Sequence, residues 1–314
     1  MKLTSWTGVL SLLLLTANCV FAQTNADEHE WKATIKVVDE NGSPVTNADV
    51  KVGYFTNNTS VEIEGTTDTN GMLIATHSTS TFNYIEYSLS FGVEKEGHYG
   101  TRSSCDLGLP YDANKWNPTV TILIKKIGKP IAMYAKAVAN LSLPELGKSI
   151  GYDLMIGDWV APYGKGVSTD ILFEKEYHEK ASNDYYSKVT VSFPKAGDGI
   201  QLFVPSDAEK DSGLRSPHGA PVNGYQSKLT RETSASPGQP IKFEYDASRI
   251  YFFRIRTALD HDGNVVSAHY GKIYGDFMTI TYYLNPTPND RNIEFDSKQN
   301  LLGGLQSFEQ VREP

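Results

Sequence analysis

Apolar and polar residues alternate along most of the chain with a period of two. The clearest runs lie at positions 85–93, 189–193, 241–245 and 278–284. In the first run Ile85, Leu89 and Val93 share one face, while Glu86 and Ser90 lie on the other. Such alternation is typical of strands that bury one face. The pattern predicts an all-β fold, because the best helical candidate is only the short stretch at 206–211.

Turn dipeptides separate these runs. Asn-Gly occurs at 41–42, 70–71 and 223–224, and Asp-Gly occurs at 198–199 and 262–263. These residues accept the positive φ angles that tight hairpins require. Strands joined by such turns indicate antiparallel sheets of the β-sandwich type.

The length of 314 residues suits two domains of ordinary size. We expect two β-sandwich domains in tandem, Ig-like or prealbumin-like, at 31–127 and 151–284. The segment 128–150 contains Pro130, Pro144 and Gly147 and is interpreted as an extended connector. The segment 285–314 opens with Asn285-Pro286 and is interpreted as an extended C-terminal tail that docks in part on a domain.

The first 22 residues predict a secretory signal peptide. Lys2 supplies the positive charge, positions 9–15 form a short apolar core, and Val20-Phe21-Ala22 ends in a small residue. Cleavage after Ala22 would place the protein outside the cytoplasm, secreted or periplasmic. The apolar core is shorter than the roughly 20 residues that span a bilayer, so no membrane span is expected.

Composition excludes several classes of function. The formal net charge is −8 at pH 7, which argues against a nucleic-acid partner because phosphate binding needs clustered basic residues. Once the signal is removed only Cys105 remains, so no intramolecular disulfide and no zinc framework can form. The seven histidines lack metal-ligand spacing. We expect no metal and no cofactor, and the sequence leaves the oligomeric state open.

The first domain carries the motif Asp39-Glu40-Asn41-Gly42-Ser43-Pro44-Val45, followed by Ala48-Asp49-Val50 and Thr67-Asp68-Thr69-Asn70-Gly71. In these residues it resembles the carboxypeptidase regulatory-like, prealbumin-type family. His98 departs from the family pattern, because it separates Gly97 from Tyr99. The resemblance implies a sandwich of seven or eight strands that serves as an accessory or adhesion-like module with no active site of its own. The second domain resembles no family that we can name.

Two motifs suggest chemistry but lack its context. Gly147-Lys148-Ser149-Ile150-Gly151 matches a nucleophile elbow, which needs a strand before the serine and a helix after it. Here Pro144 precedes the serine and a strand-like stretch follows. Asp260-His261-Asp262-Gly263-Asn264 begins like a calcium loop, but Val265 and Gly271 stand where the turn glycine and the bidentate glutamate belong. A hairpin turn explains the second segment.

The most unusual segment is Asp158 to Gly166, which combines two aromatic rings, a carboxylate and an amine between glycines. Exposed Trp159 and Tyr163, with Asp158 and Lys165 beside them, would form a ligand-binding platform on which a sugar ring stacks. The alternative is that Trp159 belongs to the core and that 162–166 is a turn between strands.

Two functions follow as hypotheses. The first is an exported, non-enzymatic β-sandwich protein that acts as a binding or structural component of the bacterial cell envelope, with a protein or glycan partner. The alternative is a carbohydrate-active or other hydrolytic enzyme at 151–284 with an accessory N-terminal module. Asp153, Asp158, Asp170 and Glu174 would then supply the carboxylates, two of them roughly 5–10 Å apart in an open groove.

Overall fold

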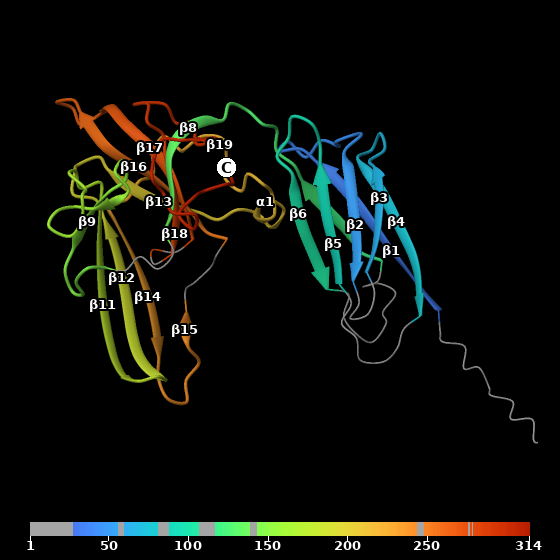
Figure 1. The fold of residues 1–314 in the computed structure, drawn as a ribbon, viewed down its shortest axis with the longest axis horizontal. Coiled ribbons are helices and arrows are strands. Elements are labelled where there is room, and N and C mark those ends of the chain that lie inside the picture. The colour runs from blue at the N-terminus through green and yellow to red at the C-terminus, as the bar shows by residue number, and fades with distance from the viewer. Residues whose placement is uncertain are drawn as a thin grey trace, which may run out of the picture.

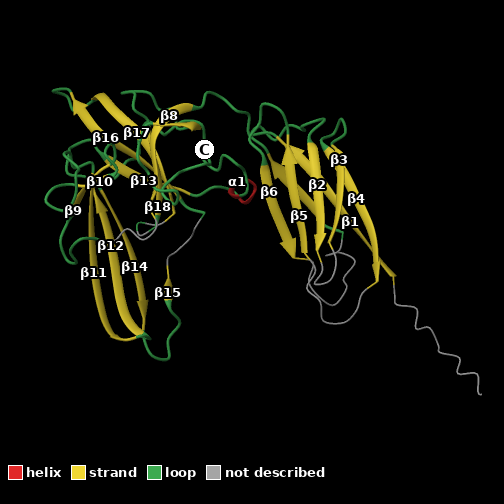
Figure 2. Cartoon of the chain, viewed as in Figure 1, coloured by secondary structure: helices red, strands yellow, loops and turns green. Residues whose placement is uncertain are grey.

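A computed structural model describes residues 28–55, 60–80, 88–106, 117–138, 143–243, 248–275, 277 and 279–314 (Figure 1). The prediction of an all-β fold is confirmed: the described residues form nineteen strands and one short helix, α1 (Asp207–Lys210) (Figure 2). The predicted signal peptide at 1–22 lies outside the described residues. Within the described ranges no helix has the length and apolarity needed to cross a bilayer.

The first seven strands form two sheets around one core, and we call this unit the N-terminal sandwich. Its strands are β1 (Glu28–Val38), β2 (Asp49–Phe55), β3 (Ser60–Thr66), β4 (Met72–Ser80), β5 (Ser88–Glu94), β6 (Thr101–Asp106) and β7 (Thr119–Leu123). One sheet has the order β4-β1-β7 and the other β3-β2-β5-β6. Trp31 stacks on Tyr54 in the core between them, with ring centroids 5.0 Å apart.

The two turn motifs of this sandwich act through aspartate side chains. Asp39 Oδ1 accepts hydrogen bonds from the backbone of Asn41 and Ser43, at 2.8 and 2.9 Å. Asp68 Oδ1 accepts in the same way from Asn70 and Met72, both at 2.8 Å. Each turn then closes on a glycine with positive φ, a conformation that a side chain disfavours. The motif at 39–45 and 67–71 is therefore turn chemistry that sets strand direction.

The remaining strands form the C-terminal sandwich, which has two sheets of six strands. The strands are β8 (Ile131–Val138), β9 (Ile150–Asp153), β10 (Asp158–Trp159), β11 (Ile171–Ala181), β12 (Asp184–Ser192), β13 (Gly199–Phe203), β14 (Lys228–Ala235), β15 (Lys242–Phe243), β16 (Ile250–Leu259), β17 (Val265–Gly275), β18 (Ile280–Leu284) and β19 (Phe295–Asn300). One sheet has the order β10-β9-β11-β12-β14-β15, and the other β13-β16-β17-β18-β8-β19.

The expected connector and tail both belong to this second sheet. Within 128–150, β8 pairs with β18 on one side and with β19 on the other, so the segment is not simply an extended connector. Within 285–314, β19 pairs in parallel with β8, so the tail supplies a strand. The interpretation of 128–150 as a connector is wrong, because β8 lies inside this sheet. The segment 285–314 docks on the C-terminal sandwich, as expected in part, and it does so through a strand and through Phe295 and Val311 in the core.

The second sheet is buried on both faces. Its inner face packs against the first sheet through residues such as Tyr251, Phe253 and Tyr282. Its outer face carries a further core in which Phe252 and Tyr283 pack against Phe295 from the tail. The C-terminal segment therefore covers a face of the sheet that would otherwise meet water, and the end of the chain lies near the place where the two sandwiches meet (Figure 1).

Candidate functional site

The predicted binding segment folds as a tight loop organised by Asp158. Its Oδ1 accepts a hydrogen bond from the Trp159 backbone at 2.8 Å, and its Oδ2 accepts one from the Lys165 backbone at 2.9 Å. A side chain at Gly164 would overlap both the Trp159 carbonyl and the Asp158 carboxylate. Both oxygens of Asp158 are thus engaged in shaping the loop.

Trp159 packs against the core instead of presenting an open face. It is half-buried, and its ring meets Tyr152 and Phe173 edge to face, with centroids 5.2 and 5.9 Å apart. Tyr163 is 41% exposed and donates its hydroxyl to Glu145 at 2.8 Å. Lys165 is exposed. The fold brings Asp158 and Lys165 together through the backbone, but it does not form the expected aromatic platform, so ligand binding by these four residues stays a prediction.

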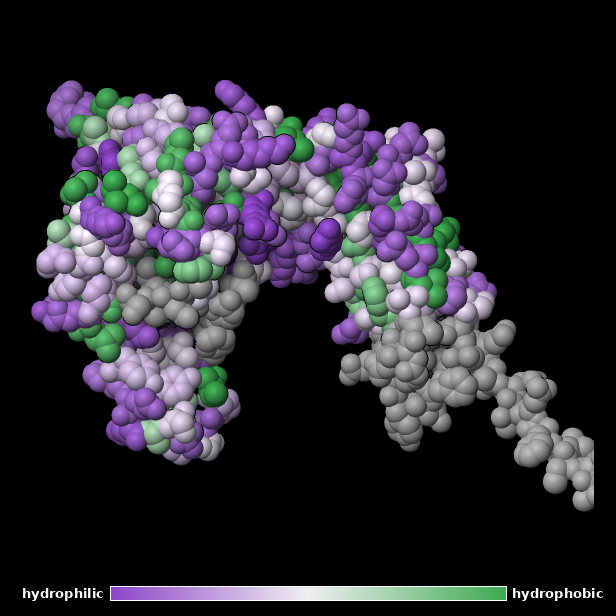
Figure 3. All heavy atoms as spheres, viewed as in Figure 1, coloured by the Kyte–Doolittle hydropathy of each residue, from purple (hydrophilic) through white to green (hydrophobic). Residues whose placement is uncertain are grey.

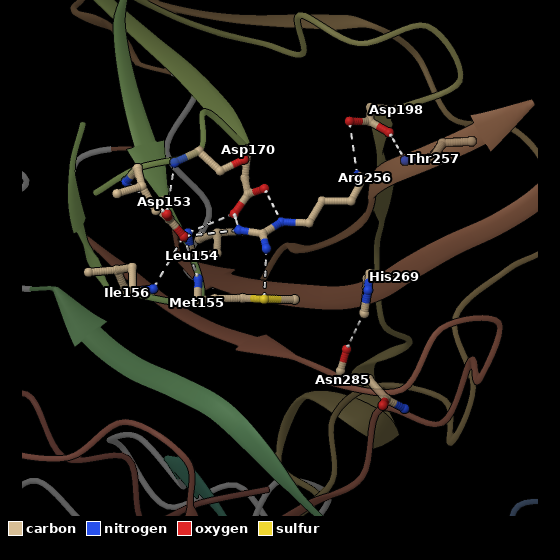
Figure 4. Close-up of polar contacts among 12 residues, drawn as sticks. Asp153, Leu154, Met155, Ile156, Asp170, Asp198, Arg256, Thr257, His269 and Asn285 are labelled. Atoms are coloured by element: carbon tan, nitrogen blue, oxygen red, sulfur yellow. Dashed lines mark hydrogen bonds and ion pairs between the residues drawn. The ribbon is translucent and has the colours of Figure 1, made fainter. Parts of the chain in front are cut away.

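Figure 4 shows an ionic cluster of Arg256 with the buried Asp153 and Asp170, and Asp153 also accepts from the backbone that follows this loop. Arg256, from β16, donates through Nε and Nη2 to the two oxygens of Asp170, at 2.8 and 3.0 Å. The same Nη2 donates to Asp153 Oδ1 at 3.1 Å. Both aspartates are 1% exposed. Burial raises the pKa of Asp170 and the arginine opposes that shift, while the hydrogen bond that Arg256 donates to Asp170 raises the pKa of Arg256. Arg256 and Asp170 therefore form a bidentate ion pair, and Asp153 is a second carboxylate bound to the same guanidinium.

The carboxylate of Asp153 has no free acceptor position. Besides Arg256, its Oδ1 accepts from the backbone of Met155 and Ile156 at 3.1 and 3.2 Å. Its Oδ2 accepts from the backbone of Val167 and Ser168 at 3.1 and 3.0 Å. A carboxylate offers about four lone-pair positions, so five donors saturate it. This arrangement ties the 153–157 turn to the 166–170 loop.

The four carboxylates of the hydrolase hypothesis are therefore all engaged in contacts within the fold. Asp153 and Asp170 form ion pairs with Arg256. Asp158 accepts backbone hydrogen bonds that hold the loop 158–166 in place. Glu174 accepts a hydrogen bond from the exposed Ser149 hydroxyl. An acid pair that hydrolyses a glycosidic bond needs one carboxyl group free to protonate and one free to attack or activate water. These contacts leave no such pair among the four.

The two sequence motifs fold as their surroundings predicted. Ser149 precedes strand β9 and has no helix after it, so the nucleophile elbow is excluded. Residues 260–264 form the hairpin turn between β16 and β17, where Asp260 Oδ1 accepts from the backbone of Asp262 and Asn264 at 2.9 and 2.8 Å. Across the described part of the chain, no group of three or more acidic, histidine or cysteine side chains is arranged to hold a metal ion.

The two sandwiches meet through a polar joint centred on Glu294. This residue lies immediately before β19 and is 2% exposed. Its Oε2 accepts hydrogen bonds from the Tyr99 hydroxyl at 2.9 Å and from the Gly128 backbone at 3.0 Å. Its Oε1 contacts His218 Nδ1, whose other ring nitrogen lies 3.2 Å from Glu40. Burial, reinforced by Glu294, raises the pKa of Tyr99, which keeps the phenol as a donor.

A second part of the joint surrounds Ser216. Lys125 follows β7, is 2% exposed and reaches across to Glu209 Oε1 at 3.0 Å and to the Ser216 carbonyl at 3.1 Å. From the opposite side the fully buried Lys272 donates to Ser216 Oγ at 3.0 Å and lies over the rings of Tyr274 and Tyr283. Backbone pairing between Gly100 and Gly213, at 2.9 Å, completes the contact. Both buried lysines direct their amines at Ser216.

A groove of about 570 Å³ opens beside this joint. Its floor is the outer face of β5 and β6, and its other wall comes from the α1 loop and the C-terminal segment. Three guanidinium groups line it, from Arg102 in β6, Arg215 after α1 and Arg312 near the C-terminus. On the face shown in Figure 3, strongly hydrophilic residues gather where the two sandwiches meet. This groove is a candidate binding site formed by the described residues.

Sequence reasoning missed these three arginines. They lie in segments separated by about a hundred residues each, and no motif links them. The sequence gives no sign of a basic site, because the net charge of the chain is −8. The three arginines form a group only once folding brings them to the same groove.

Comparisons with known proteins give no family. No family model matches the chain, and no curated protein matches it. Among solved structures, a mutant of the shaft pilin SpaA from Lactobacillus rhamnosus GG is 13% identical and has a TM-score of 0.25, covering 55% of this chain and 90% of the pilin. A streptococcal ancillary pilin is 10% identical with a TM-score of 0.24, covering 86% and 62% respectively. A DUF3823 family protein from Bacteroides uniformis is 11% identical with a TM-score of 0.19, covering 84% and 100%.

Proposed function

We propose that this protein is an exported, non-enzymatic component of the bacterial cell envelope that binds a protein or glycan partner at the joint between its two sandwiches. Export rests on the signal-like residues 1–22. The N-terminal sandwich fits this role as a carboxypeptidase regulatory-like module, and its seven strands with aspartate-closed turns at 39–45 and 67–71 support that assignment.

The observation that carries the proposal is the way in which the joint creates the groove. Glu294 and Lys125 are both buried and both reach from one sandwich to the other. Buried polar contacts of this kind fix orientation, because breaking one leaves an unpaired group in the interior. The two walls of the groove are therefore held in a set geometry, as a binding site requires.

The alternative, a hydrolase within 151–284, finds less support. Its candidate carboxylate Asp153 is saturated by Arg256 and by backbone N–H groups, and Asp170 accepts from Arg256 and from the Leu154 N–H. Their arrangement joins loops and leaves neither oxygen pair open to a substrate. Binding without turnover is the function that the contacts favour.

A glycan and envelope-protein array, probed with the chain that begins at Gln23, tests the proposal. Any saccharide bound on the array is then incubated with the protein and followed by mass spectrometry. We expect binding with the mass of the saccharide unchanged. Time-dependent cleavage would contradict the non-enzymatic role, and absence of binding to every glycan and protein on the array would contradict the binding role.

A further inference from the structure

One histidine contacts a carboxylate of each sandwich. His218 lies in the segment that follows α1, in the C-terminal half of the chain. Its Nδ1 contacts Oε1 of Glu294, which lies just before β19, and its Nε2 lies 3.2 Å from Oε2 of Glu40. Glu40 belongs to the turn between β1 and β2 in the N-terminal sandwich. The imidazole therefore links the two sandwiches through two carboxylates.

This link depends on the protonation of the ring. A neutral imidazole has one N–H donor and one lone pair, whereas an imidazolium has two N–H donors. An ionised carboxylate only accepts hydrogen bonds. Both contacts of His218 are therefore hydrogen bonds only when the ring carries its second proton, and each of them then joins opposite charges. In the neutral ring, one nitrogen lone pair faces a carboxylate and that contact is repulsive.

The exposure of the two carboxylates decides which contact is lost with the proton. The side chain of Glu294 is 3% exposed, whereas those of His218 and Glu40 are each 34% exposed. A lone pair that faced the buried Glu294 would leave a carboxylate oxygen without a donor, away from water. Water reaches Glu40 and can replace the imidazole there. The neutral ring therefore keeps its proton on Nδ1, and the bond from Nε2 to Glu40 is the one that breaks.

Other titratable groups line the joint around this ring. They are the Tyr99 phenol, which donates to Oε2 of Glu294, and the amines of Lys125 and Lys272, which donate to Ser216. Burial, reinforced by Glu294, raises the pKa of Tyr99, so the phenol stays protonated. Burial lowers the pKa of Lys272, so this amine loses its proton more readily than an ordinary lysine. A test of the imidazole must separate it from this amine.

We infer that His218 is a proton-dependent link between the two sandwiches: as an imidazolium it binds Glu294 and Glu40 at once, and as a neutral ring it stays on Glu294 and releases Glu40. The joint is therefore stronger while the imidazole holds its second proton than after it has lost it. This inference goes beyond the proposed binding function, because no ligand takes part in the link.

Nitrogen NMR of the chain that begins at Gln23, isotope-labelled at histidine, shows which ring nitrogen holds the proton. The spectrum of His218→Gln identifies the His218 signals by their loss. We expect both nitrogens to be protonated at about pH 5.5 and only Nδ1 at about pH 8.5, values on either side of the range in which histidine ordinarily titrates. A neutral ring at the lower pH, or a proton on Nε2 alone at the higher pH, would overturn the inference.

A double-mutant cycle measures the strength of the link. Urea unfolding is followed for the parent, His218→Gln, Glu40→Gln and the variant with both changes, at the same two pH values. At the lower pH, Glu40→Gln should raise the unfolding equilibrium constant about two- to fivefold in the parent and leave it unchanged in His218→Gln. At the higher pH it should raise the constant in neither background. Titration of Lys272 is common to all four proteins and cancels in the cycle.

His261 and Asp262, in the turn between β16 and β17, give the matched control. Their contact also measures 3.2 Å, but the two side chains are 88% and 65% exposed. The cycle of His261→Gln with Asp262→Asn should show a coupling below about 1.5-fold at either pH, because exposed ion pairs contribute little. Coupling between His218 and Glu40 that is equal at both pH values, or no larger than that of the control pair at the lower pH, is incompatible with a proton-dependent link.

Discussion

The hydroxyl of Tyr99 donates a hydrogen bond to the buried carboxylate of Glu294 at 2.9 Å, although the two residues lie 195 positions apart. Tyr99 belongs to the N-terminal sandwich, and Glu294 leads into the last strand of the C-terminal sandwich. The same carboxylate also accepts from the Gly128 backbone, at the point where the chain passes between the sandwiches. One side chain therefore holds together three segments that the sequence keeps far apart.

Replacing Glu294 should weaken this joint. Glu294→Ala leaves the Gly128 N–H and the Tyr99 hydroxyl without their acceptor, so we expect the free energy of unfolding to fall by about 2–4 kcal/mol. Urea unfolding followed by tryptophan fluorescence measures it. Glu62→Ala is the control, because Glu62 has 60% of its side chain exposed and should cost less than about 0.5 kcal/mol. Equal effects from the two changes would show that the joint contributes nothing to stability.

The sequence predicted the type of fold more readily than its division into units. Alternation at 189–193 and 85–93 marks strands with one face in the core, and such strands are easy to recognise. Strand β8 is different, because its neighbours β18 and β19 place it inside a sheet that is covered on both faces. Met133 and Ala135 are buried, and Tyr134 between them is also partly covered. A strand covered on both faces loses its period of two. The residues that suggest a connector, Pro130, Pro144 and Gly147, flank this strand and do not interrupt it.

Removing the arginine of the buried cluster should be strongly destabilising. Arg256→Gln leaves Asp153 and Asp170, each 1% exposed, without their shared cation. Loss of one partner from a buried ion pair typically costs about 3–5 kcal/mol. Thermal unfolding of Arg256→Gln beside Arg102→Gln checks this, because Arg102 is exposed and should change stability by less than about 0.5 kcal/mol. A loss below about 1 kcal/mol for Arg256→Gln would contradict a structural role for the cluster.

Lys272 should give the protein a pH dependence on the alkaline side. Burial lowers the pKa of this fully buried amine from its ordinary 10.5, so between the lowered value and 10.5 the unfolded chain binds more protons than the folded one. The free energy of unfolding contributed by Lys272 therefore rises with pH through that window. Lys272→Met removes this contribution.

The stability of the parent relative to Lys272→Met should accordingly increase as the pH is raised from about 7 toward 10.5, measured by urea unfolding at several pH values. Lys180→Met should show no such trend, since 86% of that side chain is exposed. The explanation would be contradicted if the free energies of unfolding of the parent and of Lys272→Met differed by the same amount at every pH in this range.

Gly271 marks the tightest packing between strands of the second sheet. A methyl group at this position would overlap the Phe253 ring and the Tyr283 carbonyl, both from neighbouring strands. Gly271→Ala should therefore lower the free energy of unfolding by about 1–3 kcal/mol through overpacking. Gly303→Ala is a matched control, because no atom lies within 4 Å of its added methyl group. Comparable stability of the two variants in thermal unfolding would contradict the packing described for β17.

The site was harder to predict than the fold for a physical reason. Asp153 and Asp170 attract notice as carboxylates, but their role is set by Arg256, which follows Asp170 by 86 residues. The sequence suggests that Trp159 is an exposed ring on which a sugar stacks. Its contacts with Tyr152 and Phe173 show instead that the ring packs at the edge of the core. The three groove arginines share no spacing at all. The pairing of the two aspartates with Arg256 and the approach of the three arginines to one another arise only in the folded chain. Residue type and spacing along the sequence therefore cannot predict them.

The central claim is that partners bind at the joint and not at the loop 158–166. The most direct test is one comparison of dissociation constants, by isothermal titration with a ligand identified on the array, for the parent, the Arg102→Gln/Arg312→Gln double variant and Asp158→Ala. We predict a loss of affinity of at least about tenfold in the double variant and an unchanged affinity in Asp158→Ala. Unchanged affinity in the double variant together with a loss in Asp158→Ala would contradict the claim and place the binding site in the loop.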